Sequence, residues 1–377
     1  MRLSLTLVIL LVALTVMGCH TVGSKTVRGA QAEYSTGLSY SWNKQLLLNL
    51  VRLRYGEAPL FLETTSLSTQ HSFEMGANFS PLWDRSVEST TTALSGAGLS
   101  RSNTRGDSGD EYGHSANLGY YERPTVTYTP LQGEDFVTRA HTPVSFDQML
   151  LLMRSGWDPR HVMALCTQRL NGLDNASPAS GPTPRMAPDY EEFARMLELS
   201  LALSSDELSD LVFEEDEEGT HLLFTMEEND PRAQEWRALL GLDPEATRFE
   251  FRNWTSRPEP SELSMQTRSF VGIMYYLCNA VAVPETHREK GWVVNTVGDD
   301  GAPFDWSEVT GKFLTVHSSV TPPTDAFVSA RHEGHWFYIV KSDMDSKYTF
   351  AMLRTLFSLL SGDPEKQSPT LTLPVGR

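Results

Sequence analysis

The sequence predicts an α+β fold with mixed helices and mainly antiparallel hairpins, arranged in two modules. Segments with helical periodicity are interspersed with segments that alternate apolar and polar residues. Several neighbouring strand candidates are joined as hairpins, and no regular strand–helix–strand series is present, which favours α+β over a doubly wound sheet. The length of 377 residues suits two domains of roughly 150 residues each, or one large domain with insertions.

The predicted helices are recognised by their caps and by their apolar periodicity. Asn43 precedes an apolar stripe that ends at Gly56, and Ser145 with Gln148 forms a capping box. Asp158 and Pro159 are typical of an N-cap and a first helical position, and Gly172 is the expected stop of that helix. Further helices are expected at 190–203, 231–240, 261–283 and 346–360, the third of which is apolar on most faces and therefore central.

The predicted strands are short segments of alternating or β-rich sequence. Leu208 to Phe213 and His221 to Met226 flank an acidic run, which predicts a hairpin with that run at its tip. The other strands are expected at 60–62, 67–79, 124–129, 248–252, 313–316, 327–330 and 336–340, with an edge strand at 371–375.

Residues 86–118 form a low-complexity insert of Ser, Thr, Gly and Asn with almost no large apolar side chains. The composition favours a long flexible loop. An alternative is that parts of it, such as Thr92 to Ser100, are strands of a hairpin that extends from the body. Oligomeric secretion channels build shared barrels from such hairpins, and their transmembrane strands need only about nine to eleven residues.

The organisation expected along the chain has five parts. Residues 1–18 are a signal peptide and 19–41 a polar tether, and 42–173 form an N-terminal α+β module that carries the insert. The proline-rich segment 174–188 is the best linker candidate. Residues 189–377 then form a C-terminal α+β module.

The first nineteen residues carry a targeting signal. Arg2 is followed by a fifteen-residue apolar run, interrupted only by Ser and Thr, and then by Gly18 and Cys19. A run of this length behind one positive charge is typical of a secretory signal peptide, because a spanning helix needs about 20 apolar residues. The segment from Val16 to Cys19 resembles a bacterial lipobox. The whole pattern also resembles uncharacterised lipoproteins of Gram-negative envelopes, which implies no particular activity.

The lipobox resemblance implies cleavage before Cys19, acylation of that cysteine with fatty acids such as palmitate, and a mature chain of 377 − 18 = 359 residues. His20 stands where an inner-membrane retention signal would place Asp, which favours the outer membrane facing the periplasm. Removal of Arg2 leaves 30 basic and 48 acidic residues, a charge of −18. Such a body is repelled by anionic headgroups and by nucleic acid, so its membrane contact is expected through the lipid alone.

Cys166 and Cys278 are the two cysteines that remain. An oxidising envelope would permit a disulfide between them. Each lies in an apolar helix-like run, however, and we favour buried free thiols that pack as small apolar groups. Two cysteines cannot form a four-thiolate zinc site, and no C-x-x-C pair is present.

Two short motifs resemble parts of catalytic signatures but lack their partners. Gly106 to Gly109 matches the segment around the nucleophile of chymotrypsin-like proteases, but Asp110 follows it and Ser108 lies in the low-complexity insert. Ser41 and Lys44 have the S-x-x-K spacing of penicillin-binding enzymes without the other two motifs of that family. We therefore expect no catalytic residue at either motif.

His332-Glu333-Gly334-His335 suggests a zinc site, but its two histidines are three apart and strand-like residues flank them. A hairpin turn is the favoured interpretation, and the sequence does not assign His287 or His317 as a further ligand. The run from Asp206 to Asp230 holds eleven acids and lacks calcium-loop spacing, so a solvated acidic tip is expected, which could face a basic partner. The aromatic pairs near Trp336 and Tyr275 are expected in the core.

The sequence favours a lipid-anchored envelope protein with a structural, assembly or protein-binding role. No catalytic, metal or cofactor-binding residue is predicted, and Cys19 is the single predicted site, for lipid attachment. Another protein or further copies of this chain are the expected partners. One alternative is a subunit of an oligomeric outer-membrane pore or secretion channel to which each copy contributes residues 67–131. A second is an envelope hydrolase, which would require His287, His317, His332 and His335 to cluster with carboxylates in a cleft.

Overall fold

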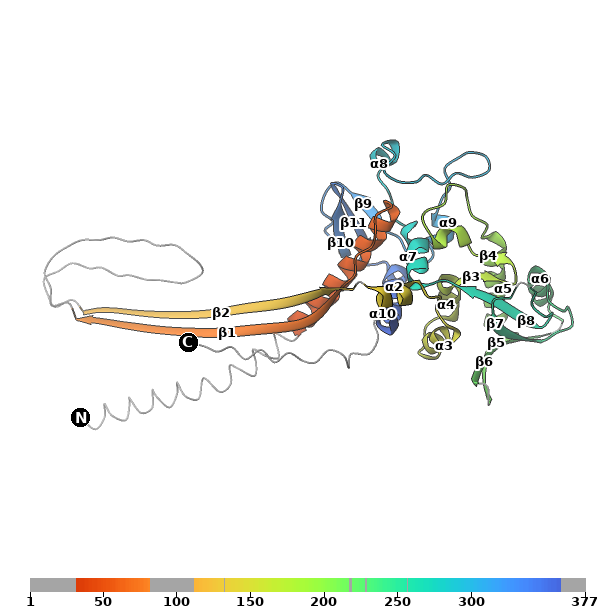
Figure 1. The fold of residues 1–377 in the computed structure, drawn as a ribbon, viewed down its shortest axis with the longest axis horizontal. Helices are drawn as coiled ribbons and strands as arrows, with labels where there is room; N and C mark the ends of the chain where they lie inside the picture. Colours follow the sequence, from red (N-terminus) through yellow and green to blue (C-terminus); the bar gives the residue numbers. More distant parts are fainter. Residues whose placement is uncertain are drawn as a thin grey trace. The chain divides into compact units, whose positions relative to one another are not determined.

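The computed structural model describes residues 32–81, 112–131, 133–216, 219–227, 229–255 and 257–360 (Figure 1). These residues form an α+β fold, as the sequence predicts. They divide into two compact units, a hairpin unit within residues 62–131 and a body that contains residues 32–61 and 133–360. The acylation candidate Cys19, the predicted signal peptide and the predicted edge strand at 371–375 lie outside the described residues.

The hairpin unit consists of β1 (Leu62–Pro81) and β2 (Tyr112–Pro130), which run side by side and antiparallel (Figure 1). Their register extends from the pair Leu62 and Pro130 to the pair Pro81 and Tyr112, with one irregularity between Thr64 and Ser66. The loop expected at 86–118 is therefore wrong for residues 112–118, which belong to β2. The rest of that insert, including Thr92 to Ser100, falls outside the described residues.

The larger sheet of the body has six strands in the order β4-β3-β8-β7-β6-β5. Its neighbouring strands are antiparallel except for β7 and β8, which are parallel. The predicted acidic hairpin is confirmed as β5 and β6. The strands are β3 (Thr167–Leu170), β4 (Leu173–Asp174), β5 (Ser209–Asp216), β6 (Gly219–Met226), β7 (Arg248–Asn253) and β8 (Glu262–Thr267).

A smaller antiparallel sheet has the order β10-β11-β9. Its strands are β9 (His317–Ser319), β10 (Ala326–His332) and β11 (His335–Val340). The turn between β10 and β11 contains Glu333 and Gly334 at φ angles of 43° and 83°, the positive values that a two-residue hairpin turn of this kind requires. The sequence interpretation of His332 to His335 as a hairpin turn is thus confirmed.

The first helix of the body covers residues 32–54. It is followed by α2 (Glu134–His141), α3 (Phe146–Arg154), α4 (Pro159–Cys166), the 3-10 turn η1 (Ser177–Ser180), α5 (Glu191–Ser205), α6 (Pro231–Leu239), α7 (Phe270–Cys278), α8 (Glu285–Glu289), α9 (Ser307–Thr310) and α10 (Met344–Leu360). The capping box of Ser145 and Gln148 and the Asp158 cap are both present, as predicted.

The helix α7 forms the centre of the body. All of its residues except Tyr275 are buried, and it packs against α2, α10 and η1. Phe270 at its start lies with Phe61 and Phe357 in an aromatic cluster whose ring centroids are 5.4 to 5.9 Å apart. Each such ring contributes roughly 1.5–3 kcal/mol when its apolar surface leaves water. Cys166 and Cys278 are free and buried, in agreement with the favoured interpretation.

Four predicted boundaries differ from the structure. The first helix begins by residue 32, within the expected tether and ahead of the predicted start at Asn43. The helix α4 ends at Cys166, since Thr167 to Leu170 pair as β3. Residues 262–267 are β8, since the cap at Ser269 delays the central helix to Phe270. Residues 313–316 form no strand beyond an isolated bridge from Val316 to Val281.

The segment 174–188, the expected linker, lies inside the body. Ala176 and Ala179 in it are fully buried. The buried Arg268 explains this packing, because its guanidinium donates hydrogen bonds to the Asn175 carbonyl oxygen and to Ser180 Oγ, at 2.9 Å for the latter. The structure accordingly divides the chain around residues 62–131 and not at the proline-rich segment.

Candidate functional site

Three of the four histidines considered above come together in the body. The ring centroids of His287 and His335 are 4.6 Å apart, and the Tyr55 ring lies 5.8 Å from His287 and 5.0 Å from His332. The fourth, His317, instead lies against Tyr338. The clustering that a hydrolase would require is therefore met in part. We refer to Tyr55, Glu57, His287, His332, Glu333 and His335 as the imidazole cluster.

Three chain segments that are distant in sequence build this cluster. The first helix ends at residue 54, and Gly56 at a φ angle of 75° turns the chain so that Tyr55 and Glu57 lie at the helix end. The short helix α8 supplies His287, and the β10–β11 turn supplies the remaining members. Glu333 occupies the left-handed region, which costs a non-glycine residue roughly 1–2 kcal/mol.

The half-buried Tyr55 and the buried His287 form the first part of the imidazole cluster. The Tyr55 hydroxyl and His287 Nδ1 are hydrogen-bonded at 2.6 Å, and the His287 ring also lies 4.6 Å from Trp292. Burial lowers the pKa of His287, and the nearby His335 and Lys290 lower it further. Burial raises the pKa of Tyr55 to about 12. At neutral pH this pair is therefore an uncharged phenol beside an uncharged imidazole.

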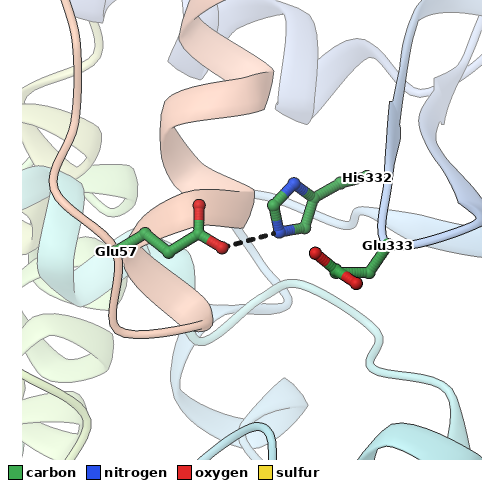
Figure 2. A group of neighbouring side chains, drawn as sticks. All are labelled: Glu57, His332 and Glu333. Carbon is green, nitrogen blue, oxygen red and sulfur yellow. Dashed lines mark ion pairs between the residues drawn. The ribbon is translucent and has the colours of Figure 1, made fainter.

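Glu57, His332 and Glu333 form the second part of the imidazole cluster (Figure 2). His332 Nε2 lies 3.2 Å from Glu57 Oε1, and one atom from each of the three side chains lies within 4.8 Å of the others. His332 Nε2 is buried, yet it makes no hydrogen bond of good geometry with a described residue. The short distance to Glu57 is thus an electrostatic contact without an aligned N–H donor.

These three side chains can supply the ligands of a divalent metal ion. Zinc takes imidazole nitrogen and carboxylate oxygen at about 2.0–2.1 Å, so two ligands of one tetrahedral ion lie roughly 3.3 Å apart. The separation of 3.2 Å between His332 Nε2 and Glu57 Oε1 fits that geometry. Three protein ligands leave a fourth position for water or substrate, as in catalytic zinc sites.

We expect the tag-free, full-length chain to bind one Zn²⁺ at Glu57, His332 and Glu333. The E57Q variant should bind zinc at least tenfold more weakly, because it replaces a charged ligand by an amide. Competition with a chromophoric chelator measures both affinities. The matched control is Glu289→Gln, which removes an exposed carboxylate of α8. Equal zinc affinity of the wild-type chain and E57Q would show that His332 and Glu57 form an ion pair only.

The other candidate residues of the sequence occupy structural positions or lie beyond the described residues. Ser108 lies outside the described residues, and Ser41 and Lys44 lie within the first helix. Burial raises the pKa of Cys166 and of Cys278 to about 12, so neither is a reactive thiolate at neutral pH.

Part of the acidic run is paired with arginines of the body. Glu214 contacts Arg248 at 2.5 Å, and Asp206 contacts Arg232 at 2.7 Å. Glu215 lies 3.5 Å from Arg154. These carboxylates are therefore partly neutralised by neighbours within the chain.

Tyr55 and Glu57 are members of the imidazole cluster that sequence reasoning does not single out. Tyr55 and His287 are separated by 232 positions, so no local spacing connects them. The sequence contains only an indirect signal for these two residues. Tyr55 and Glu57 flank Gly56, the glycine at which the first helix is predicted to end.

Among the described residues, no helix combines the length and apolar character needed to cross a membrane. Comparisons with protein-family models, with curated proteins and with solved structures found no match to this chain.

Proposed function

We propose that this chain is a lipid-anchored envelope protein that assembles with further copies of itself through the β1–β2 hairpin. In the assembly, the hairpins pair edge to edge and form one sheet that inserts into the outer membrane as a channel. The observation that carries this proposal is the residue pattern of the hairpin, which is read through the register of its two strands.

The two faces of the distal half of the hairpin differ sharply in composition. Directly opposite residues of an antiparallel pair share a face, so the register assigns each residue pair to one face. One face holds the pairs Phe73 with Tyr120, Met75 with Leu118, Ala77 with Ala116, Phe79 with His114 and Pro81 with Tyr112. The other face holds Glu74 with Gly119, Gly76 with Asn117, Asn78 with Ser115 and Ser80 with Gly113. This alternation of apolar with small or polar residues is typical of strands that face lipid on one side and water on the other.

The length of the apolar face suits the hydrocarbon layer. Residues 73–81 span eight steps of about 3.4 Å, or roughly 27 Å along the strand. A tilt of about 40° reduces this to roughly 21 Å, close to the apolar band of about 25 Å in membrane-spanning sheets. Phe73 and Tyr120 pair at one end of the stretch and Tyr112 lies at the other, as expected for aromatic girdles.

The edges of the hairpin supply the argument for assembly. β1 and β2 form a two-stranded sheet, so each has one edge that no described strand pairs with. An isolated hairpin is at best marginally stable in water, and a long unpaired edge is a template for further strands. Because the two strands are antiparallel, the β1 edge of one copy can pair with the β2 edge of the next. Such head-to-tail contacts close into a ring when the rotation fits, which removes all edges.

The particle mass of the acylated protein in mild detergent tests this proposal. We expect a mass of many times that of one chain, which is 42.1 kDa before the signal peptide is removed, with a single polypeptide in the particle. A variant that lacks residues 73–120 should be monomeric with an intact body. A monomeric full-length protein would overturn the proposal. A particle that contains a second polypeptide would overturn self-assembly and indicate that the hairpin pairs with another protein.

A further inference from the structure

The body contains a cavity of about 390 Å³ between α8, α9 and the end of the first helix. This volume lies within the range of small-molecule sites. Two arginines line it, together with polar and aromatic residues that include Asn295, Trp306 and Ser307. No histidine lines this cavity, so it is distinct from the imidazole cluster although both use neighbouring positions of the chain.

Arg54 is the buried arginine of this cavity. It is 6% exposed, and its Nη1 donates hydrogen bonds to the Val294 carbonyl oxygen at 3.0 Å and to Thr183 Oγ1 at 3.4 Å. Its Nε is buried and has no acceptor among the described residues. A buried guanidinium N–H without a partner is costly, because water no longer solvates it.

Arg288 is the second arginine, and its Nε is likewise buried without an acceptor. Within the described part of the chain, no hydrogen bond or ion pair of its side chain is found. Burial lowers the pKa of Arg54, and the charge of Arg288 lowers it further, whereas Cys278 and Tyr55 act in the opposite direction. The two positive charges are thus close enough to repel each other.

The charge balance of the chain makes this pair unusual. The sequence has 48 acidic and 31 basic residues, yet neither arginine has an ion-pair partner among the described residues. Asp305 is the one acidic residue that lines the cavity. It is exposed, and its Oδ1 accepts a hydrogen bond of 2.9 Å from the Ser307 backbone N–H. The charge of the two guanidiniums therefore remains uncompensated within the described residues.

The neighbouring polar side chains are committed to the fold. Thr183 Oγ1 donates to Asn279 Oδ1, and the Asn279 amide donates to the backbone carbonyls of Tyr275 and Tyr276. Thr310 Oγ1 donates to the Trp306 carbonyl. Among the described residues that line the cavity, the two arginines are the only ones with positively charged donors.

We propose that this cavity binds an oxyanion group, a carboxylate or a phosphate, between Arg54 and Arg288. Guanidinium groups match such anions because their N–H donors form a planar fork. An anion there would accept hydrogen bonds from the guanidinium groups of both arginines and balance both charges. The group would be a free small anion or the terminal group of a larger molecule, and both sources offer the same oxygen acceptors.

Calorimetric titration of the full-length chain in detergent with inorganic phosphate, and separately with acetate, tests this site. Ionic strength is held constant with sodium chloride, so that general screening does not change. We expect saturable binding of at least one of the two anions. The R288Q variant should weaken it at least tenfold, and Arg139→Gln, which removes an exposed arginine of α2 that does not line the cavity, should leave it unchanged.

Arg288→Lys supplies a second variant, since it keeps the charge but lacks the planar fork. It should bind more weakly than the wild type and more tightly than R288Q. Preference for phosphate would assign a phosphate group, and preference for acetate would assign a carboxylate. Absence of saturable binding of both anions, or equal binding by R288Q with a native circular dichroism spectrum, would overturn the proposal.

Discussion

An arginine in place of Ala77 should abolish the assembled particle. Ala77 pairs with Ala116 near the middle of the apolar face of the hairpin, where lipid is expected. Arginine or lysine at the midplane of a lipid-facing strand costs about 2–4 kcal/mol, and each copy in the assembly would carry this cost. We expect light scattering in detergent to report monomers for A77R, and lipid bilayers to show no conductance.

The neighbouring position supplies the matched control. Asn78 pairs with Ser115 on the polar face, so Asn78→Arg introduces the same side chain one residue away but towards water. This variant should keep the particle mass of the wild type and change only the ion preference of the conductance. An equal loss of assembly in both variants would mean that the face assignment is wrong. If A77R kept the particle mass of the wild type, the face that carries Ala77 would not be the one that contacts lipid.

Local signals explain why much of the body could be predicted. The Ser145 side chain accepts from the Gln148 N–H, and the Gln148 side chain accepts from the Ser145 N–H, at 3.3 and 3.0 Å. Asp158 likewise accepts from the Arg160 N–H at 2.9 Å. These contacts join residues two or three positions apart, so the sequence alone contains them.

The missed elements depend on weaker or more distant signals. In β8, Leu263 and Met265 alternate with polar residues shortly before the apolar central helix, and the cap at Ser269 separates the strand from the helix. In β2, Tyr112 to Leu118 alternates with glycine, serine and asparagine, and the surrounding low-complexity sequence obscures that pattern. The pairing of the two strands supplies the missing evidence, because it aligns Leu118 with Met75, 118 − 75 = 43 positions earlier.

The two arginines of the cavity could not be singled out from the sequence. Arg54 ends an amphipathic helix, where a basic residue is ordinary, and Arg288 lies in a short polar segment. Their significance comes from burial and from the absence of ion-pair partners among described residues, which are properties of the folded chain. The same holds for Tyr55 and His287 in the imidazole cluster.

Arg268 connects more of the body than any local signal predicts. Its side chain is 1% exposed and lies 4.2 Å from the centroid of the Tyr276 ring. Nη1 donates to the carbonyl oxygens of Ala164, Leu165 and Thr167 at the end of α4, where the helix dipole favours a positive charge. Burial lowers its pKa to about 10, which leaves it charged at neutral pH. One side chain thus holds α4, β3, η1 and the segment 174–188 together.

Replacement of Arg268 by methionine should destabilise the body by about 3–5 kcal/mol. The change leaves several buried carbonyl oxygens without donors, and each unsatisfied group costs roughly 1–3 kcal/mol. Urea unfolding followed by tryptophan fluorescence measures the loss as a lower midpoint. Arg268→Lys should recover only part of it, since an ammonium group cannot reach acceptors on opposite sides of the pocket. Arg331→Met, at an exposed position of β10, should change the midpoint little. An unchanged midpoint in R268M would show that the segment 174–188 is held by its own turns and that the arginine is incidental to the packing of the body.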